Sequence, residues 1–155
     1  MSRLAIVCAA MVLSPLAYAN VSQALAAART KWDSLGVGNY SFVYSGAGSN
    51  IVPYQCIPYS MRSTVKNGRP RLSTLLDGHG QCDIGGRPPK YWHWPRTVEE
   101  LFAAVERLAS FDPEEVRLAV EFDLVTGIPV HMRAEMLQIT DSDEGFDITE
   151  MKIKR

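Results

Sequence analysis

The sequence contains little cysteine, no large excess of either charge and neither of two common catalytic motifs. Only 3 of its 155 residues are cysteine, and 16 basic side chains nearly balance 17 acidic ones. A nearly neutral chain offers no basic face, so we expect no nucleic-acid partner. The patterns Gly-x-Ser-x-Gly and His-Glu-x-x-His are missing, so the sequence identifies no catalytic residue and implies no cofactor.

Long apolar runs are also missing, except near the N-terminus. There, Arg3 precedes an apolar run over 4–16, and Ala17-Tyr18-Ala19 forms a small-x-small cleavage site. This pattern predicts a secretory signal peptide over 1–19, leaving a mature domain over 20–155. The alternative is an uncleaved membrane anchor, but the run is shorter than the roughly 20 residues that span a bilayer. We therefore expect a periplasmic or secreted product without stable membrane insertion.

The few cysteines become informative once export is assumed. Cys8 leaves with the signal peptide, so Cys56 and Cys82 are the thiols of the mature chain. An even pair in an oxidising compartment is typical of a disulfide, worth on the order of 3 kcal/mol for a loop of about 25 residues. The alternative is a zinc site in which His79 and His93 join the two cysteines.

Apolar periodicity predicts two helices, over 20–35 and 97–110. In the first, Gly36 is a natural C-terminal stop, and in the second Thr97 and Glu100 form a capping box. The apolar residues at helical spacing are Val21, Ala24, Leu25, Ala28, Trp32 and Leu35 in the first helix, and Val98, Leu101, Phe102, Val105 and Leu108 in the second.

Alternating patterns predict the strands. Asn67-Gly68 is a strong signal for a hairpin turn, and Pro70 suits a strand whose donors face solvent. The predicted strands cover 40–45, 61–66, 69–75, 116–123, 130–136 and 146–153, with a turn over 46–50 and a long loop over 77–96. We therefore expect an α+β fold, an antiparallel β-sheet of about six strands with two helices packed on one face.

The order of several motifs resembles a known family. Four motifs follow Trp32 and the turn over 65–68 in a recognisable order. They are the segments 97–102, 120–123 and 126–129 and the acidic pair Asp143-Glu144. In this order they resemble DUF6174, a bacterial exported domain family of unknown function. The resemblance covers about 32–153 and implies a small secreted or lipid-anchored protein. It implies no catalytic residue.

Three groups of residues are candidate sites. Loop aromatic side chains are typical of interfaces, so Tyr91, Trp92, His93 and Trp94 are candidate binding residues. Alternatively, these side chains close the edge of the core. A second group could be part of a calcium loop or a solvated turn, and consists of Asp141, Asp143, Glu144 and Asp147.

The third group is the polar face of the predicted C-terminal strands, where His131 would be a general base or one member of a ladder of opposite charges. We expect a non-enzymatic binding module for an unknown envelope protein or ligand, with the disulfide-pinned loop over 77–95 as contact surface. The alternative is a small envelope hydrolase or metal-dependent enzyme using His79, His93 or His131.

Overall fold

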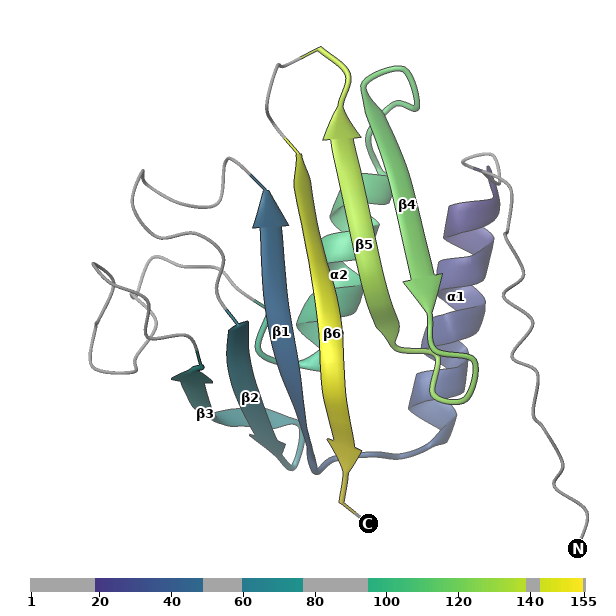
Figure 1. Cartoon of the computed structure of the whole chain (residues 1–155). Coiled ribbons are helices and arrows are strands. Elements are labelled where there is room, and N and C mark those ends of the chain that lie inside the picture. Colours follow the sequence, from purple (N-terminus) through teal and green to yellow (C-terminus); the bar gives the residue numbers. More distant parts are fainter. Residues whose placement is uncertain (1–18, 49–59, 77–94, 139–142, 155) are drawn as a thin grey trace, which may run out of the picture.

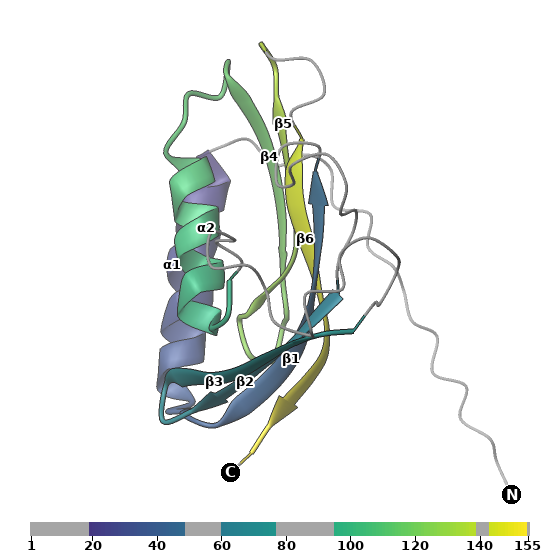
Figure 2. The ribbon, with the colours of Figure 1, turned by 90° about the vertical axis from the view of Figure 1, so that its left-hand side faces the viewer.

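The computed structural model describes residues 19–48, 60–76, 95–138 and 143–154, which form one sheet covered by two helices (Figure 1). The helices are α1 (Ala19–Ser34) and α2 (Val98–Ala109). The strands are β1 (Tyr40–Gly48), β2 (Ser60–Lys66), β3 (Arg69–Leu75), β4 (Val116–Phe122), β5 (Pro129–Met136) and β6 (Glu144–Ile153). Both helices lie on the same side of the sheet (Figure 2). The α+β fold expected from the sequence is therefore confirmed.

The sheet joins two antiparallel meanders through its centre. Its strand order is β3-β2-β1-β6-β5-β4, with all of the paired strands antiparallel. The first and last strands of the chain are therefore neighbours. Asn67 and Gly68 have φ of 51° and 70°, as the predicted hairpin turn requires, and β3 with Pro70 is an edge strand.

The core lies between the helices and the inner face of the sheet. Tyr40, Phe42 and Tyr44 of β1 are at most 3% exposed, and the five apolar residues of the predicted α2 stripe are completely buried. Val98 N–H donates to the Tyr40 hydroxyl at 3.0 Å, which ties the start of α2 to β1. Burial raises the pKa of this hydroxyl, although the hydrogen bond from Val98 opposes the shift.

The capping box of α2 forms as predicted, with one change. Thr97 Oγ1 accepts from Glu100 N–H at 3.1 Å, as an N-cap does. The Glu100 carboxylate, however, accepts from Arg96 N–H at 2.6 Å, one residue before the cap. The box therefore also fixes the chain that enters the helix.

Two details of the predicted elements were wrong. Ala24 does not join the core face of α1, because its side of the helix is exposed, and Leu35 is exposed because it follows the end of α1 at Ser34. The predicted turn over 46–50 is also too early, because β1 continues to Gly48 and pairs Gly46 with Phe146. Pairing with β6, which continues to Gly48 and Glu144, holds this glycine-containing segment extended.

A large apolar side chain, Val43, is buried on the helix-free face. Val43 alternates with the core aromatics of β1 and yet is only 4% exposed. Arg62 is its register partner on β2, and the Arg62 guanidinium reaches Glu150 of β6 at 2.5 Å. This ion pair spans β1 near Val43. Among the described residues, no helix is long and apolar enough to cross a membrane.

Candidate functional site

The predicted aromatic loop has a fixed base, although Tyr91, Trp92, His93 and Trp94 lie outside the described residues. On one side, Leu76 N–H donates to Ser60 O at 2.8 Å at the end of β3. On the other side, Pro95 is buried and Arg96 O accepts from the Ser63 hydroxyl at 2.6 Å. The loop therefore leaves and re-enters the fold at two hydrogen-bonded positions.

Two described residues that border the segments containing Cys56 and Cys82 are hydrogen-bonded to each other. Cys56 and Cys82, together with His79 and His93, lie outside the described residues. The residues that border those segments are described: Ser60 follows the first segment and Leu76 precedes the second. Their hydrogen bond joins the start of β2 to the end of β3.

A row of polar side chains crosses the helix-free face of the sheet at one register. In strand order β2, β1, β6, β5 and β4, the register places Ser60, Ser45, Asp147, His131 and Glu121 in line. The hydroxyls of the first two residues are 2.8 Å apart. This row supports the ladder interpretation of the polar face.

Asp147 is the centre of this row. One carboxylate oxygen lies 2.6 Å from His131 Nδ1, and the other lies 2.9 Å from Arg133 Nη2. Partial burial raises the pKa of Asp147, but the hydrogen bonds from His131 and Arg133 outweigh that effect and hold it below its usual value. The ionised carboxylate therefore orients the His131 ring and the Arg133 guanidinium on the open face.

The described members of the candidate calcium group point to different partners. The Glu144 carboxylate pairs with Arg107 of α2 on the helix side, and Asp147 faces the opposite side of the sheet. Asp143 is exposed, and Asp141 lies outside the described residues. Over the four described ranges, no cluster of three or more potential metal ligands occurs.

A Ser-x-x-Lys spacing at Ser63 and Lys66 was missed in the sequence. Ser63 is completely buried on the inner face of β2, where its hydroxyl donates to Arg96 O. Lys66 is exposed beside the hairpin turn, and residues three apart in a strand point to opposite faces. The serine therefore holds the entrance of α2, and the lysine is not its base.

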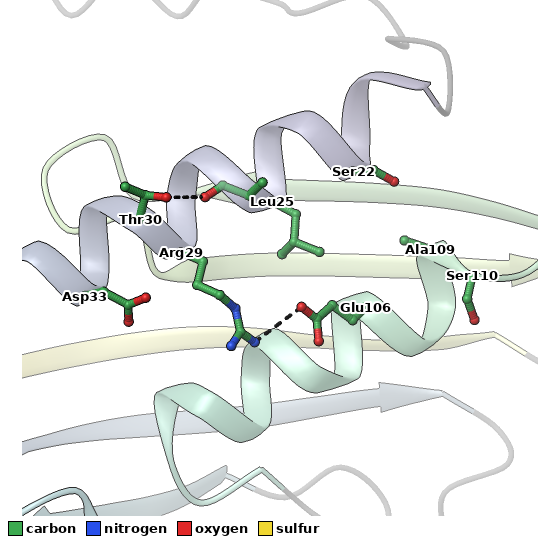
Figure 3. A pocket seen from close by; sticks show the side chains of 9 residues that line it. Ser22, Leu25, Arg29, Thr30, Asp33, Glu106, Ala109 and Ser110 are labelled. Atoms are coloured by element: carbon green, nitrogen blue, oxygen red, sulfur yellow. Dashed lines mark hydrogen bonds and ion pairs between the residues drawn. The ribbon is translucent and has the colours of Figure 1, made fainter.

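Sequence reasoning also missed a groove between the two helices on the side away from the sheet (Figure 3). The groove has a volume of about 560 Å³ and is centred on Arg29. The Arg29 guanidinium lies 5.0 Å from the centre of the Phe102 ring, 3.6 Å from Glu99 and 3.4 Å from Glu106. Periodicity could have placed Arg29 on α1, but the pairing needs the antiparallel packing of α1 on α2.

The chemistry of the groove is mixed. Ser22, Thr30 and Ser110 contribute hydroxyls, and Asp33 adds a carboxylate near the end of α1. Arg29 Nε is buried and has no hydrogen-bond partner. Because two glutamates already neutralise Arg29, the groove combines polar groups of both signs without a single dominant charge.

Comparison with known proteins places the chain in a family without assigning an activity. No curated protein and no solved structure matches the chain. A family model does match, described as a family of unknown function, and it covers residues 24–152. That range includes α2, most of α1 and all six strands apart from Ile153, the last residue of β6. The chain is therefore a member of DUF6174, a family of unknown function.

Proposed function

We propose that the protein is an exported binding domain that contacts an envelope protein through the loop over 77–95. In this proposal the signal peptide over 1–19 directs export, and a Cys56–Cys82 disulfide makes the loop rigid. A closed loop loses little conformational freedom when it binds, so more of its contact energy contributes to affinity.

The observation that carries the proposal is the hydrogen bond between Leu76 and Ser60. Cys56 precedes Ser60 by four residues and Cys82 follows Leu76 by six, and a chain spans at most roughly 3.5 Å per residue. Both thiols are thus tethered within about 15 to 20 Å of one hydrogen-bonded junction. This arrangement supports a disulfide between the two segments.

The contact chemistry in the proposal comes from the aromatic residues of the loop. Tyr91, Trp92 and Trp94 provide large, stiff side chains with one polar edge each, a combination that is enriched at protein interfaces. The described base of the loop is a rigid sheet edge and a helix N-terminus, which is how protein scaffolds typically present binding loops.

The export and disulfide parts are tested by intact mass spectrometry of protein purified from the bacterial envelope. We expect a chain that begins at Asn20 and gains the mass of two hydrogens only after reduction. Free thiols before reduction, or a metal that a chelator removes, would instead favour the zinc alternative and a metal-dependent enzyme.

The binding part is tested by photocrosslinking in the envelope. A benzoylphenylalanine at Trp92 should give a discrete protein adduct, whereas the same group at Leu72, an exposed apolar residue of β3, should not. The adduct should weaken in a Cys56→Ser, Cys82→Ser variant. Equal adducts from both positions, or none from position 92, would contradict the loop as contact surface.

A further inference from the structure

The edge of β4 is a second surface with a specific chemistry, separate from the aromatic loop. β4 ends the sheet and pairs on one side only, with β5. The opposite edge strand, β3, contains Pro70 and has an irregular register with β2 between Thr64 and Val65, features typical of protected edges. β4 contains no proline, and its register with β5 shifts only near its end, between Glu121 and Phe122, so residues 116–121 form a regular edge.

The hydrogen bonds of β4 show which of its backbone groups are open. Leu137 N–H donates to Glu115 O, and Asp123 N–H donates to Ile128 O, both at 2.8 Å. Antiparallel pairs alternate, so the odd-numbered residues of β4 bond to β5. The N–H and C=O groups of Leu118, Val120 and Phe122 therefore point toward the open edge, and none of them bonds to another described residue outside the sheet ladder.

The charges along this edge are ordered. On the helix-free face, Arg117 and Glu121 flank Ala119 at intervals of two residues and are exposed. Arg117 already contacts Glu135 of β5 at 3.0 Å, but Glu121 forms no ion pair with another described residue. A strand added here would meet one positive and one negative side chain with a small residue between them.

The helix layer continues beyond the edge of the sheet. Figures 1 and 2 show α1 on the helix side of the sheet, alongside β4 at its outer edge. Lys31 Nζ donates to Leu124 O at 2.7 Å, so the Lys31 side of α1 faces the turn at the end of β4. At 100° per residue, Ala24 shares that side with Lys31, and both are exposed. The side of α1 that carries Ala24 and the Lys31 stem would therefore lie near the inner side chains of an added strand.

The turn after β4 adds two apolar side chains to the same surface. Leu124 and Val125 are 87% and 77% exposed, unusual values for adjacent large apolar residues. The turn is rigid, because Asp123 Oδ1 accepts from Val125 N–H, Thr126 N–H and the Thr126 hydroxyl. The exposed pair is thus held in place at the end of the open strand.

From these observations we infer that β4 binds an extended segment of a partner polypeptide, which pairs with it as a seventh strand. Backbone hydrogen bonds to Leu118 and Val120 provide affinity, as in other cases of β-strand addition. Specificity comes from an acidic residue opposite Arg117, a basic residue opposite Glu121 and apolar residues directed at α1. The inference does not depend on the aromatic loop.

Backbone amide exchange in the free protein, followed by NMR, is the first test. The amides of Leu118, Val120 and Phe122 should exchange rapidly, while those of Ala119 and Glu121 should be protected by β5. Protection of the first three in a dilute sample would overturn the inference, since the chain itself would already cover the edge. Protection that appears only on concentration would identify a second copy as the occupant and also overturn it.

Titration with synthetic peptides is the second test. The probe contains Lys-Val-Thr-Ile-Glu, which in antiparallel register places its lysine opposite Glu121 and its glutamate opposite Arg117. We expect shifts and slowed exchange at Leu118 and Val120. Glu121→Lys should weaken this binding by roughly three- to tenfold, and a probe with its two charges exchanged should recover part of the loss.

A blocking variant provides an independent control. Val120→Pro removes the backbone N–H that faces the open edge and leaves the hydrogen bonds to β5 intact. The variant should therefore abolish peptide binding while circular dichroism shows that the chain is still folded. If Val120→Pro unfolds the chain, the affinities of Glu121→Lys for the two probes still test strand addition at β4. Binding that persists unchanged in the folded Val120→Pro and Glu121→Lys variants would overturn strand addition at β4.

Discussion

Asp123 shows how one side chain organises a turn that the sequence only marks by Thr126 and Gly127. Its carboxylate accepts three hydrogen bonds, one from Val125 and two from Thr126. Hydrogen bonds from the Thr126 hydroxyl and backbone, with a smaller contribution from Lys31, lower the pKa of Asp123 below its ordinary 3.8 despite partial burial. Its contribution to stability therefore depends on ionisation.

We predict that Asp123→Ala lowers the free energy of unfolding by about 1–3 kcal/mol at pH 7, because three donors lose their acceptor. A lowered pKa in the folded state stabilises the fold fully above the unfolded pKa, and this stabilisation is lost as pH falls through the folded pKa. The difference between variant and parent should thus shrink below about pH 4. Urea unfolding of both proteins at several pH values measures this difference in the free energy of unfolding.

Asp33→Ala is the matched control, since Asp33 is exposed near the end of α1 and accepts no side-chain hydrogen bond among the described residues. Its effect should remain within about 0.5 kcal/mol at all pH values. A loss for Asp123→Ala that is the same at pH 7 and pH 2.5 would mean that the ionised carboxylate is not responsible.

At the scale of elements, the contact between α1 and the β4–β5 turn depends on a glycine. Gly127 has φ of 79°, and a Cβ at this position would lie 2.2 Å from Ala28 O in α1. Gly36, at the end of α1, has a similar φ of 60° but open space around it. Substitution of Gly36 therefore introduces backbone strain alone, whereas substitution of Gly127 introduces backbone strain and a steric clash with α1.

We predict that Gly36→Ala costs about 1 kcal/mol, the usual strain of a side chain at positive φ. Gly127→Ala should cost more than about 3 kcal/mol, because α1 and the turn must also move apart. Urea unfolding of both variants measures the difference. Equal losses would contradict tight packing between Gly127 and Ala28.

At the scale of the whole molecule, stability depends on the seam between β1 and β6, where the two meanders meet. Phe146 of β6 is 1% exposed and pairs in register with Gly46 of β1 and Met132 of β5. Its ring centre lies 5.7 Å from that of Tyr44. A large residue shared by both halves should make them unfold together.

We predict that Phe146→Ala lowers the free energy of unfolding by about 3–5 kcal/mol while the transition remains single. Far-ultraviolet circular dichroism and tryptophan fluorescence should give the same midpoint. Phe111→Ala, at a 40% exposed position after α2, is the control and should cost far less. Two separate transitions would show that the meanders fold independently.

Much of this fold was predictable because most elements have one clear periodicity. Strand β4 alternates without exception, and the stripe of α2 begins at a recognisable cap, so both could be located to within a residue or two. The C-terminal end of β1 and the exposed side of α1 were not predictable. Alanine and glycine are compatible with core, surface and turn, so their environment depends on which elements pack beside them.

The candidate sites were predictable only as residue types. The sequence identified His131 and Asp147 as polar strand residues, but their contact depends on the register of β5 against β6. Arg29 gave no sequence signal, because its partners Glu99 and Glu106 belong to a helix about seventy residues later. Contacts between distant segments follow from packing, which a local pattern does not encode.

By itself, the sequence determined the identity and order of the helices and strands, the Asn67-Gly68 turn and the fold class, because these depend on local backbone preferences and apolar periodicity. The tertiary structure alone decided that β1 lies beside β6, that β4 is left with an open edge, and that α1 lies next to this edge. Periodicity indicates which face of a strand is buried. Which strands pair depends on how all of the apolar faces pack together in one core, and periodicity does not encode that arrangement.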